Sequence, residues 1–221
     1  MKALVLANGD LHEPGVLRKR VRAGHFDLVV AADAGARHAR TLNLKLDAIV
    51  GDMDSIGDAK REYPADVDVV SYPAEKNETD LELALLYARE HGADTIVVVG
   101  GTGDRLDMTV ANVLLLAHPR LNPSVIKIWH GSQTAWLIRP PGGVIPGLPG
   151  DTISLIPLGG DASGVTTAGL MYALRRATLT FGKSRGVSNL VEKPPTRVSL
   201  KSGILLAVHT PVAGTKGKVK Q

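Results

Sequence analysis

Residues 95–105 read Thr-Ile-Val-Val-Val-Gly-Gly-Thr-Gly-Asp-Arg, an apolar run that ends in a glycine-rich turn. The run is apolar on both faces, as a strand inside a covered parallel sheet must be. Five further short runs of this kind occur in the first half of the chain, at 3–7, 28–32, 48–50, 67–70 and 125–129. The first half therefore predicts the strands of a buried, mainly parallel sheet.

Helical patterns separate several of these runs. Thr79-Asp80-Leu81-Glu82 is a capping box, after which positions 81, 84, 85 and 88 give one apolar stripe. A second helix is expected from about 105 to 117, ending before Pro119. Its predicted buried face carries Leu106, Val110 and Val113, and its opposite face carries Arg105, Met108, Thr109 and Asn112. Strands alternating with helices predict an α/β, doubly wound domain.

The second half has a different composition and a different hydrophobic pattern. From residue 131 onward glycines and prolines are frequent, and short alternating runs occur at 152–157, 177–180, 197–200 and 204–208. Regular short strands with turn residues predict a β-sandwich. The segment 140–150 fits either a linker or hairpin loops. We expect an α/β domain at 1–130, an all-β sandwich domain at 131–212 and a disordered tail at 213–221.

Composition narrows the class of protein. The chain has 221 residues, 44% of them hydrophobic, and no cysteine. It can bury a core, and it offers neither a disulfide framework nor a thiolate nucleophile. Its longest apolar runs are far shorter than the ~20 residues that cross a bilayer. The first apolar run is also too short for a signal peptide. We therefore expect a cytoplasmic protein with no membrane partner.

Charge is unevenly distributed along the chain. From Asp33 to Asp80 there are eleven acidic and six basic residues, whereas 175–201 has seven basic residues and one acidic residue. The acidic stretch would repel phosphate unless cations intervene, and the basic stretch would attract it.

Polar residues follow four of the predicted strands, where an open parallel sheet binds its ligands. The segments are 8–10 (Asn-Gly-Asp), 33–35 (Asp-Ala-Gly), 51–55 (Gly-Asp-Met-Asp-Ser) and 100–104 (Gly-Gly-Thr-Gly-Asp). Asp52 and Asp54 are close enough to converge on Mg²⁺, which takes hard oxygen ligands. An ordinary Asx turn explains that motif equally well.

The glycine-rich turn leads into Arg105 at a helix start. Backbone N–H groups of such a turn can surround a phosphate, and the helix N-terminus adds partial positive charge. Lys76 and Asp80 flank the capping box; taken alone, they fit a solvated lysine and a carboxylate that complements the helix dipole.

Together the motifs resemble the thiamine pyrophosphokinase (thiamine diphosphokinase) family. The matching segments are 33–36 (Asp-Ala-Gly-Ala), 51–55, 76–85 (Lys-Asn-Glu-Thr-Asp-Leu-Glu-Leu-Ala-Leu), 100–108 with Asn112, and Ser188-Asn189 ahead of 203–206. Their order and spacing cover the chain up to about His209. Three positions depart from the family pattern. Met53 replaces a Phe, Met108 replaces a His, and Ala34 replaces a frequent Gly.

The resemblance implies transfer of pyrophosphate from ATP to the hydroxyl of thiamine, giving thiamine diphosphate and AMP, with Mg²⁺ as cofactor. It also implies a homodimer with thiamine bound between subunits. The implied catalytic residues are Asp33, Asp54, Asp80 and Lys76, and the implied metal ligands are Asp52, Asp54 and Asp80. Implied ATP contacts are Asn8, Gly101, Thr102, Gly103, Arg105 and Asn112, and implied thiamine contacts are Ser188 and Asn189.

Two other classes of function remain. One is a nucleotide-binding regulatory module on the same fold without diphosphokinase activity. It would keep the glycine turn but would not need convergent carboxylates. The other is nucleic-acid binding through 175–201 and the tail, for which the sequence lacks interleaved aromatic residues. Trp129 and Trp136 are expected in the sandwich core instead.

Overall fold

The computed structural model describes residues 1–52 and 66–212. It divides into two compact units, the first comprising Met1–Ser132 and the second beginning at Gln133. Asp54 and the predicted tail at 213–221 lie outside the described residues.

The first unit is a six-stranded parallel sheet in the order β6-β5-β1-β2-β3-β4. Its strands are β1 (Lys2–Leu6), β2 (Leu28–Ala32), β3 (Ala48–Gly51), β4 (Asp68–Ser71), β5 (Thr95–Val99) and β6 (Val125–His130). All six predicted runs are strands. The chain builds outward from β1 to β4 and then returns to the other side of β1 with β5, so the strand order reverses between β1 and β5.

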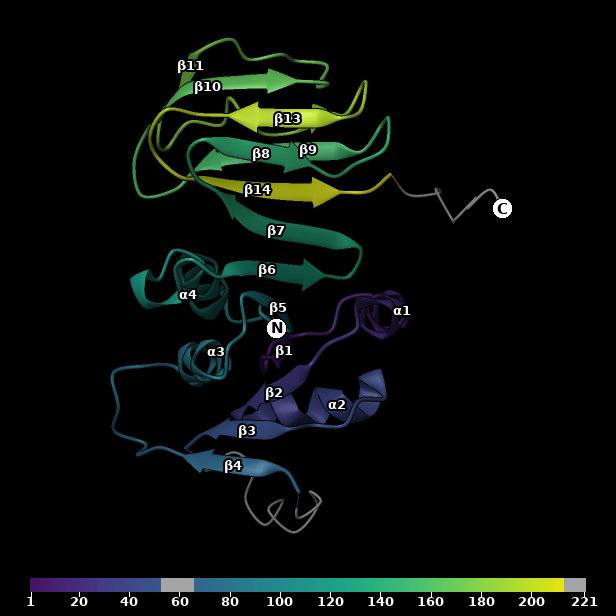
Figure 1. The fold of residues 1–221 in the computed structure, drawn as a ribbon, viewed down its shortest axis with the longest axis vertical. Helices are drawn as coiled ribbons and strands as arrows, with labels where there is room; N and C mark the ends of the chain where they lie inside the picture. Colours follow the sequence, from purple (N-terminus) through teal and green to yellow (C-terminus); the bar gives the residue numbers. More distant parts are fainter. Residues whose placement is uncertain (53–65, 213–221) are drawn as a thin grey trace. The chain divides into compact units, whose positions relative to one another are not determined.

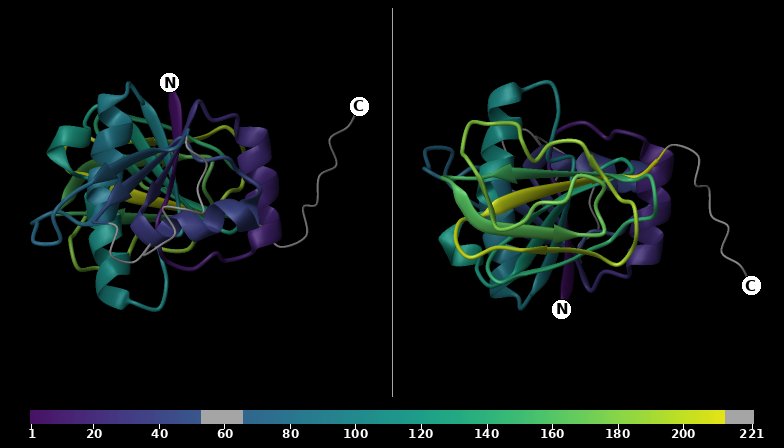
Figure 2. Two further views of the ribbon diagram at one scale, coloured as in Figure 1. Left: turned by 90° about the horizontal axis from the view of Figure 1, so that it is seen from below. Right: turned by 90° about the horizontal axis from the view of Figure 1, so that it is seen from above.

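Helices cover both faces of this sheet, as Figure 1 and the left view of Figure 2 show. The helices are α1 (Pro14–Gly24), α2 (Arg37–Leu42), α3 (Asp80–Glu90) and α4 (Leu106–Leu115), with 3₁₀ turns η1 (Asp33–Ala36) and η3 (Pro119–Leu121). Leu17 and Val21 of α1 and Leu42 of α2 share one buried cluster with Leu4 and Leu6 of β1. The other face is covered by α3, whose Leu81, Ala84, Leu85 and Ala88 are buried as predicted.

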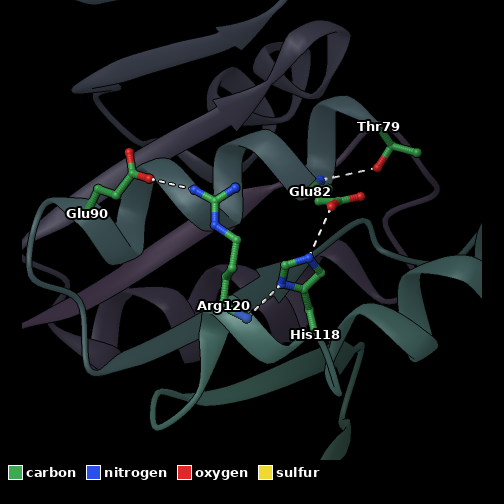
Figure 3. A network of polar contacts seen from close by, with 5 residues as sticks. All are labelled: Thr79, Glu82, Glu90, His118 and Arg120. Atoms are coloured by element: carbon green, nitrogen blue, oxygen red, sulfur yellow. Dashed lines mark hydrogen bonds and ion pairs between the residues drawn. The ribbon is translucent and has the colours of Figure 1, made fainter. Parts of the chain in front are cut away.

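The capping box at α3 forms only in part (Figure 3). The Thr79 hydroxyl accepts a hydrogen bond from the Glu82 backbone N–H at 3.2 Å. The Glu82 carboxylate pairs instead with His118 Nε2 at 3.2 Å. His118 Nδ1 accepts from the Arg120 backbone N–H, and Arg120 reaches Glu90 at 3.1 Å. The Glu82 side chain thus ties α3 to the turn after α4 rather than closing its own cap.

The predicted buried face of α4 is wrong. Leu106 and Val110 are 75% and 52% exposed, and Val113 is only partly buried. The face that packs against the unit carries Asn112, and Leu116 is buried just beyond the helix end. Because α4 is apolar around most of its circumference, hydrophobic spacing does not determine which side faces the sheet.

The second unit is an all-β sandwich, which confirms the predicted fold class. One sheet has the order β12-β9-β14-β7 and the other β11-β10-β13-β8, with antiparallel pairing throughout both. The strands are β7 (Gln133–Ile138), β8 (Gly142–Ile145), β9 (Thr152–Pro157), β10 (Ala162–Ala168), β11 (Ala177–Leu179), β12 (Asn189–Leu190), β13 (Thr196–Ser199) and β14 (Leu205–Thr210). The 140–150 segment contains β8, so hairpin loops rather than a linker explain its glycines and prolines.

Alternating burial builds the sandwich core. Along β9 the residues Ile153 and Leu155 are buried between half-exposed neighbours, the period expected of a strand with one covered face. They share a cluster with Ile145 and Val198 of the other sheet, and Trp136 packs against it as predicted. Trp129 lies elsewhere, on β6 of the first unit, where its ring meets the edge of Phe26. None of the described helices is long and apolar enough to span a lipid bilayer.

A buried carboxylate connects the loop before β9 to the last strand of the sandwich and the segment that follows it. Asp151 is 3% exposed and accepts hydrogen bonds from the backbone N–H groups of Leu148 (2.8 Å) and Val212 (3.0 Å). Its Oδ2 also lies 2.8 Å from His209 Nε2. Burial alone would raise the pKa of Asp151, but these hydrogen bonds hold it below its usual value.

We predict that Asp151→Asn lowers the free energy of unfolding by about 1–3 kcal/mol near neutral pH, because an NH₂ group replaces one carboxylate oxygen and a buried backbone N–H loses its acceptor. A depressed carboxyl pKa stabilises the fold above the unfolded pKa of ~3.9, and that stabilisation is lost as pH falls through the folded pKa. Urea unfolding at neutral and acidic pH measures both effects. Asp161→Asn, which alters an exposed carboxylate that accepts from Phe181 N–H, is the matched control. Equal losses in the two variants would contradict the assignment.

Candidate active site

The loops after β1 and β5 are joined by backbone hydrogen bonds. The N–H groups of Ala7, Gly9 and Asp10 donate to the carbonyls of Val99, Gly100 and Thr102 at 2.7–2.8 Å. A Cβ on Gly9 would lie 2.3 Å from Thr102 O, and a Cβ on Gly100, whose φ is +73°, would lie 2.4 Å from Ala7 O. Glycine is therefore required in both loops for their close approach.

Three carboxylates converge at the same edge of the sheet. Asp33 begins η1 after β2, Asp52 follows β3, and Asp80 begins α3. One oxygen from each lies within 4.8 Å of the others. A Cβ on Gly51 would lie 2.8 Å from Asp33 Cβ and 3.2 Å from Asp80 Oδ1, so Gly51 leaves room for the cluster. The predicted convergence of Asp33, Asp52 and Asp80 is present.

Lys76 offsets part of the negative charge. Its Nζ lies 2.9 Å from Asp80 Oδ1 and 3.1 Å from Asp52 Oδ2. Burial alone would lower the pKa of Lys76, but the bonds to Asp80 and Asp52 raise it above the usual value. The pKa of Asp80 is also raised, by burial first and then by Asp52 and Asp33, although Lys76 opposes the shift. One ammonium group does not compensate three carboxylates.

The donor set suits a hard divalent cation. Asp33 is 5% exposed, and among the described residues its Oδ1 has no hydrogen-bond partner. A buried carboxylate oxygen without a partner is costly unless a ligand satisfies it. Three clustered carboxylates match the oxygen ligands that Mg²⁺ takes, so Asp33, Asp52 and Asp80 can hold this ion.

A cavity of about 610 Å³ is lined by Asp33 and Asp80 of the carboxylate cluster and by residues of the joined loops, whereas Asp52 is not among its lining residues. This volume is in the range of small-molecule and cofactor sites. Nine of the predicted site residues line it: Asn8, Asp33, Lys76, Asp80, Gly101, Thr102, Gly103, Arg105 and Asn112. The strand ends thus place an acidic group and a glycine-rich turn on one cavity.

Arg105 and Asn112 also make side-chain bonds within the protein. The exposed guanidinium of Arg105 makes two bonds to Asp107, at 2.6 and 3.2 Å. Buried Asn112 donates from Nδ2 to Gly101 O at 2.8 Å. Asn112 therefore holds the glycine-rich turn in place from α4.

Arg37 and His38 also lie at this site, although no sequence motif predicted them there. Arg37 lines the cavity and donates to Asn8 O at 3.0 Å. His38 is buried, and its Nε2 lies 2.8 Å from Gly9 O. Burial lowers the pKa of His38, so the ring is neutral near neutral pH. Both residues directly follow η1, so their position just after a strand end was the available signal.

The predicted thiamine contacts lie in the second unit. Ser188 is exposed with φ +59°. Asn189 is buried, and its side chain is used within the sandwich. Its Oδ1 accepts from Tyr172 N–H and Leu190 N–H at 2.9 Å, and its Nδ2 donates to Tyr172 O at 2.7 Å. Asn189 therefore holds the Tyr172 backbone from both its N–H and its carbonyl.

The basic stretch is solvent-exposed. All seven basic residues are exposed in the structure: Arg175, Arg176, Lys183, Arg185, Lys193, Arg197 and Lys201. The positive charge of this stretch is therefore carried on the surface of the sandwich.

Two family models match the chain. Residues 22–129 match the model of the thiamin pyrophosphokinase catalytic domain, and residues 143–205 match that of the thiamin pyrophosphokinase vitamin B1 binding domain. The first match lies within the first unit and the second within the sandwich.

Individual proteins give the same result. Thiamine pyrophosphokinase of Bacillus subtilis is 31% identical over 164 residues, covering 72% of this chain and 76% of that protein. Thiamine pyrophosphokinase 1 of Oryza sativa subsp. japonica is 25% identical over 201 residues, covering 86% and 74%.

Solved structures share the fold. Thiamine pyrophosphokinase of Bacillus subtilis superposes with a TM-score of 0.83 at 24% identity, covering 96% of this chain and 100% of that one. Thiamin pyrophosphokinase from Candida albicans gives 0.73 at 18% identity, covering 95% and 88%.

A doubly wound sheet with its cavity at the strand-order reversal, followed by a β-sandwich, defines a two-domain α/β protein with a cofactor-sized site. The matches refine this class. The chain belongs to the thiamin pyrophosphokinase family, which confirms the resemblance seen in its motifs and the expectation of a thiamine diphosphokinase enzyme.

We predict that Mg²⁺ stabilises the protein, because a cation bound only in the folded state adds about 2.7 kcal/mol at a hundredfold excess over Kd. The melting temperature of the wild type should rise with Mg²⁺ by differential scanning fluorimetry. Asp52→Asn and Asp80→Asn should remove the rise. Glu90→Gln, whose carboxylate pairs with Arg120, should retain it. The same Mg²⁺ response in Asp80→Asn as in wild type would contradict the metal site.

Proposed function

We propose that the protein catalyses Mg²⁺-dependent transfer of pyrophosphate from ATP to thiamine. The observation that carries this proposal is one cavity lined both by the glycine-rich turn and by Asp33 and Asp80, two members of the three-carboxylate cluster that Asp52 completes. A regulatory nucleotide-binding module would need the turn but would not need the carboxylates. Membership in the thiamin pyrophosphokinase family supports thiamine diphosphate as the product.

In the proposed reaction the thiamine hydroxyl oxygen attacks the β-phosphorus of ATP. The bond between that phosphorus and the α–β bridging oxygen breaks, so AMP leaves with that oxygen, the hydroxyl proton passes to solvent, and thiamine diphosphate forms. Such transfers depend mainly on positioning and charge neutralisation. Asp33, Asp52 and Asp80 would hold Mg²⁺. The bound ion would supply positive charge to the phosphate oxygens. Asp54 completes the proposed metal and catalytic set, on sequence grounds alone.

The remaining site residues have separate proposed roles. We assign the phosphates to Lys76 and Arg105, with Asn8 and residues 101–103 at the glycine-rich turn. Arg37 supplies a further cation on the cavity wall. Asn112 supports the turn from behind. Ser188 remains a proposed thiamine contact, and Asn189 is assigned to holding the neighbouring Tyr172 segment.

We predict AMP and thiamine diphosphate in equal amounts from wild-type protein with Mg-ATP and thiamine, measured by chromatography. Arg105→Ala should raise KM for ATP roughly ten- to hundredfold, because a charge-assisted contact to phosphate is worth about 1.5–3 kcal/mol. Arg120→Ala, which removes an exposed guanidinium paired with Glu90, is the control and should leave KM unchanged.

ADP with thiamine monophosphate would refute pyrophosphate transfer. ATP binding without turnover would favour the regulatory module. If Arg105→Ala changed only the KM for thiamine, the glycine-rich turn would be assigned to the thiamine site instead of the ATP site.

A homodimer with thiamine bound between its subunits is part of the proposal. The supporting observation is a stripe on α4 formed by Leu106, Val110 and Leu114, which are 75%, 52% and 52% exposed. These positions are four residues apart and share one helix face. The same helix carries the cavity residues Met108, Thr109 and Asn112, so a second copy on the stripe would lie beside the site.

We predict that wild type sediments as a dimer and that Val110→Lys shifts it towards monomer, because a charge in the stripe opposes desolvation of the apolar face. Leu148→Lys, a matched change at a residue 55% exposed on the sandwich, should leave the dimer intact. Analytical ultracentrifugation measures both. A monomeric, fully active wild type would overturn the shared site.

A further inference from the structure

A histidine contacts the glycine-rich turn from outside the cavity. Thr102 Oγ1 lies 2.8 Å from His130 Nδ1. Thr102 is in the turn after β5 and lines the cavity. His130 is the last residue of β6, the strand paired with β5, and is not among the lining residues. Any effect of His130 on a bound ligand would therefore pass through Thr102.

A second histidine fixes the plane of this ring. His12, in the loop after β1, stacks on His130 with ring centroids 4.5 Å apart and an angle of 4° between the rings. Thr102 O also accepts the Asp10 N–H at 2.7 Å. The Thr102 side chain and backbone are thus both held, one by β6 and the other by the loop after β1.

The surroundings of His130, burial first, favour the neutral form of its ring. Burial lowers the pKa of His130 and the neighbouring His12 lowers it further, while Glu13 opposes the shift. Glu13 itself accepts bonds from Ser132 N–H and Oγ–H, at 2.9 and 3.0 Å. A neutral imidazole has one N–H and one acceptor nitrogen, and the Thr102 hydroxyl has a single proton.

The position of one ring proton decides what Thr102 can do. If His130 Nδ1 accepts, the Thr102 proton points away from the cavity and cannot reach a ligand. If Nδ1–H donates to Oγ1, the hydroxyl proton stays available to an acceptor in the cavity. Phosphate oxygens are acceptors only, so the second arrangement is the one that suits the proposed ligand.

We propose that His130 is a positioning residue whose Nδ1–H donates to Thr102 Oγ1, so that the Thr102 hydroxyl donates to a phosphate oxygen of ATP. The inference rests on the proposed function, because it needs a nucleotide phosphate at the glycine-rich turn. Neither His130 nor His12 touches the reacting groups.

The test compares His130→Leu, His130→Asn, Thr102→Val and the double variant His130→Leu/Thr102→Val. Asn places an amide near the position of Nδ1, whereas Leu removes the donor. His91→Leu is the matched control, because the exposed His91 contacts Tyr87 on α3 and does not line the cavity.

Losing one hydrogen bond should raise KM for ATP about three- to tenfold in His130→Leu and in Thr102→Val, with kcat and KM for thiamine changed less than about twofold. The double variant should be no worse than either single variant, since both act through one contact. His130→Asn should recover most of the wild-type KM. A normal KM in His130→Leu, additive effects in the double variant, or no recovery with Asn would overturn the inference.

Two further measurements separate this inference from the proposed function. If wild type makes no thiamine diphosphate, calorimetry should still show weaker Mg-ATP binding in His130→Leu and Thr102→Val than in wild type. Equal dissociation constants in wild type and these variants would overturn the inference. Failure of wild type to bind Mg-ATP would overturn both. In ¹⁵N-histidine spectra of the protein with Mg-ATP, His130 should carry its proton on Nδ1, and a proton on Nε2 would contradict the proposal.

Discussion

The backbones that follow β1 and β5 stay hydrogen-bonded after both strands end, and this pairing determines the shape of the cavity. Three N–H groups, from Ala7, Gly9 and Asp10, bond across to the β5 side. The two loops can approach this closely because Gly9 and Gly100 have no side chains. The pairing occurs where the strand order reverses, which is where open α/β sheets bind ligands. Three residues contact it from different elements: His38 from α2, His130 from β6 and Asn112 from α4.

Opposite these loops, the fold holds carboxylates that repel one another. Asp33, Asp52 and Asp80 follow β2, follow β3 and begin α3, so the packing of the sheet and of α3 enforces their proximity. Lys76 neutralises part of this charge through bonds of 2.9 and 3.1 Å. The pKa of Asp80 is nevertheless raised, by burial first and then by the neighbouring Asp52 and Asp33. A site in this condition favours a divalent cation, and a cation held there would face the phosphates of a nucleotide on the glycine-rich turn.

Much of this arrangement follows from sequence, because the apolar runs and the rule for strand ends place Asp33 and Asp52 at one edge of the sheet. Asp80 begins a helix, and only the family resemblance added it to the predicted site. Other features depend on packing. The orientation of α4 does not follow from its spacing, since the helix is apolar nearly all round and Val110 faces outward. Glu82 has the residue type and the spacing from Thr79 that a capping box requires. Its carboxylate nevertheless pairs with His118, far along the chain. Asn189 matches a family motif, but its amide is satisfied by Tyr172. In each case a local pattern has several possible partners, and only the tertiary structure selects one.

We propose that one cation site and one phosphate site share the cavity. Paramagnetic relaxation tests it directly, with Mn²⁺ in place of Mg²⁺ and α,β-methylene-ATP as an analogue that resists cleavage of the α–β bond. Mn²⁺ bound by wild type should shorten the ³¹P relaxation times of the bound analogue, and Asp80→Asn should lose this effect while Glu90→Gln retains it. Mn²⁺ that binds the protein without relaxing the phosphorus nuclei, or relaxation that is unchanged in Asp80→Asn, would contradict the shared site.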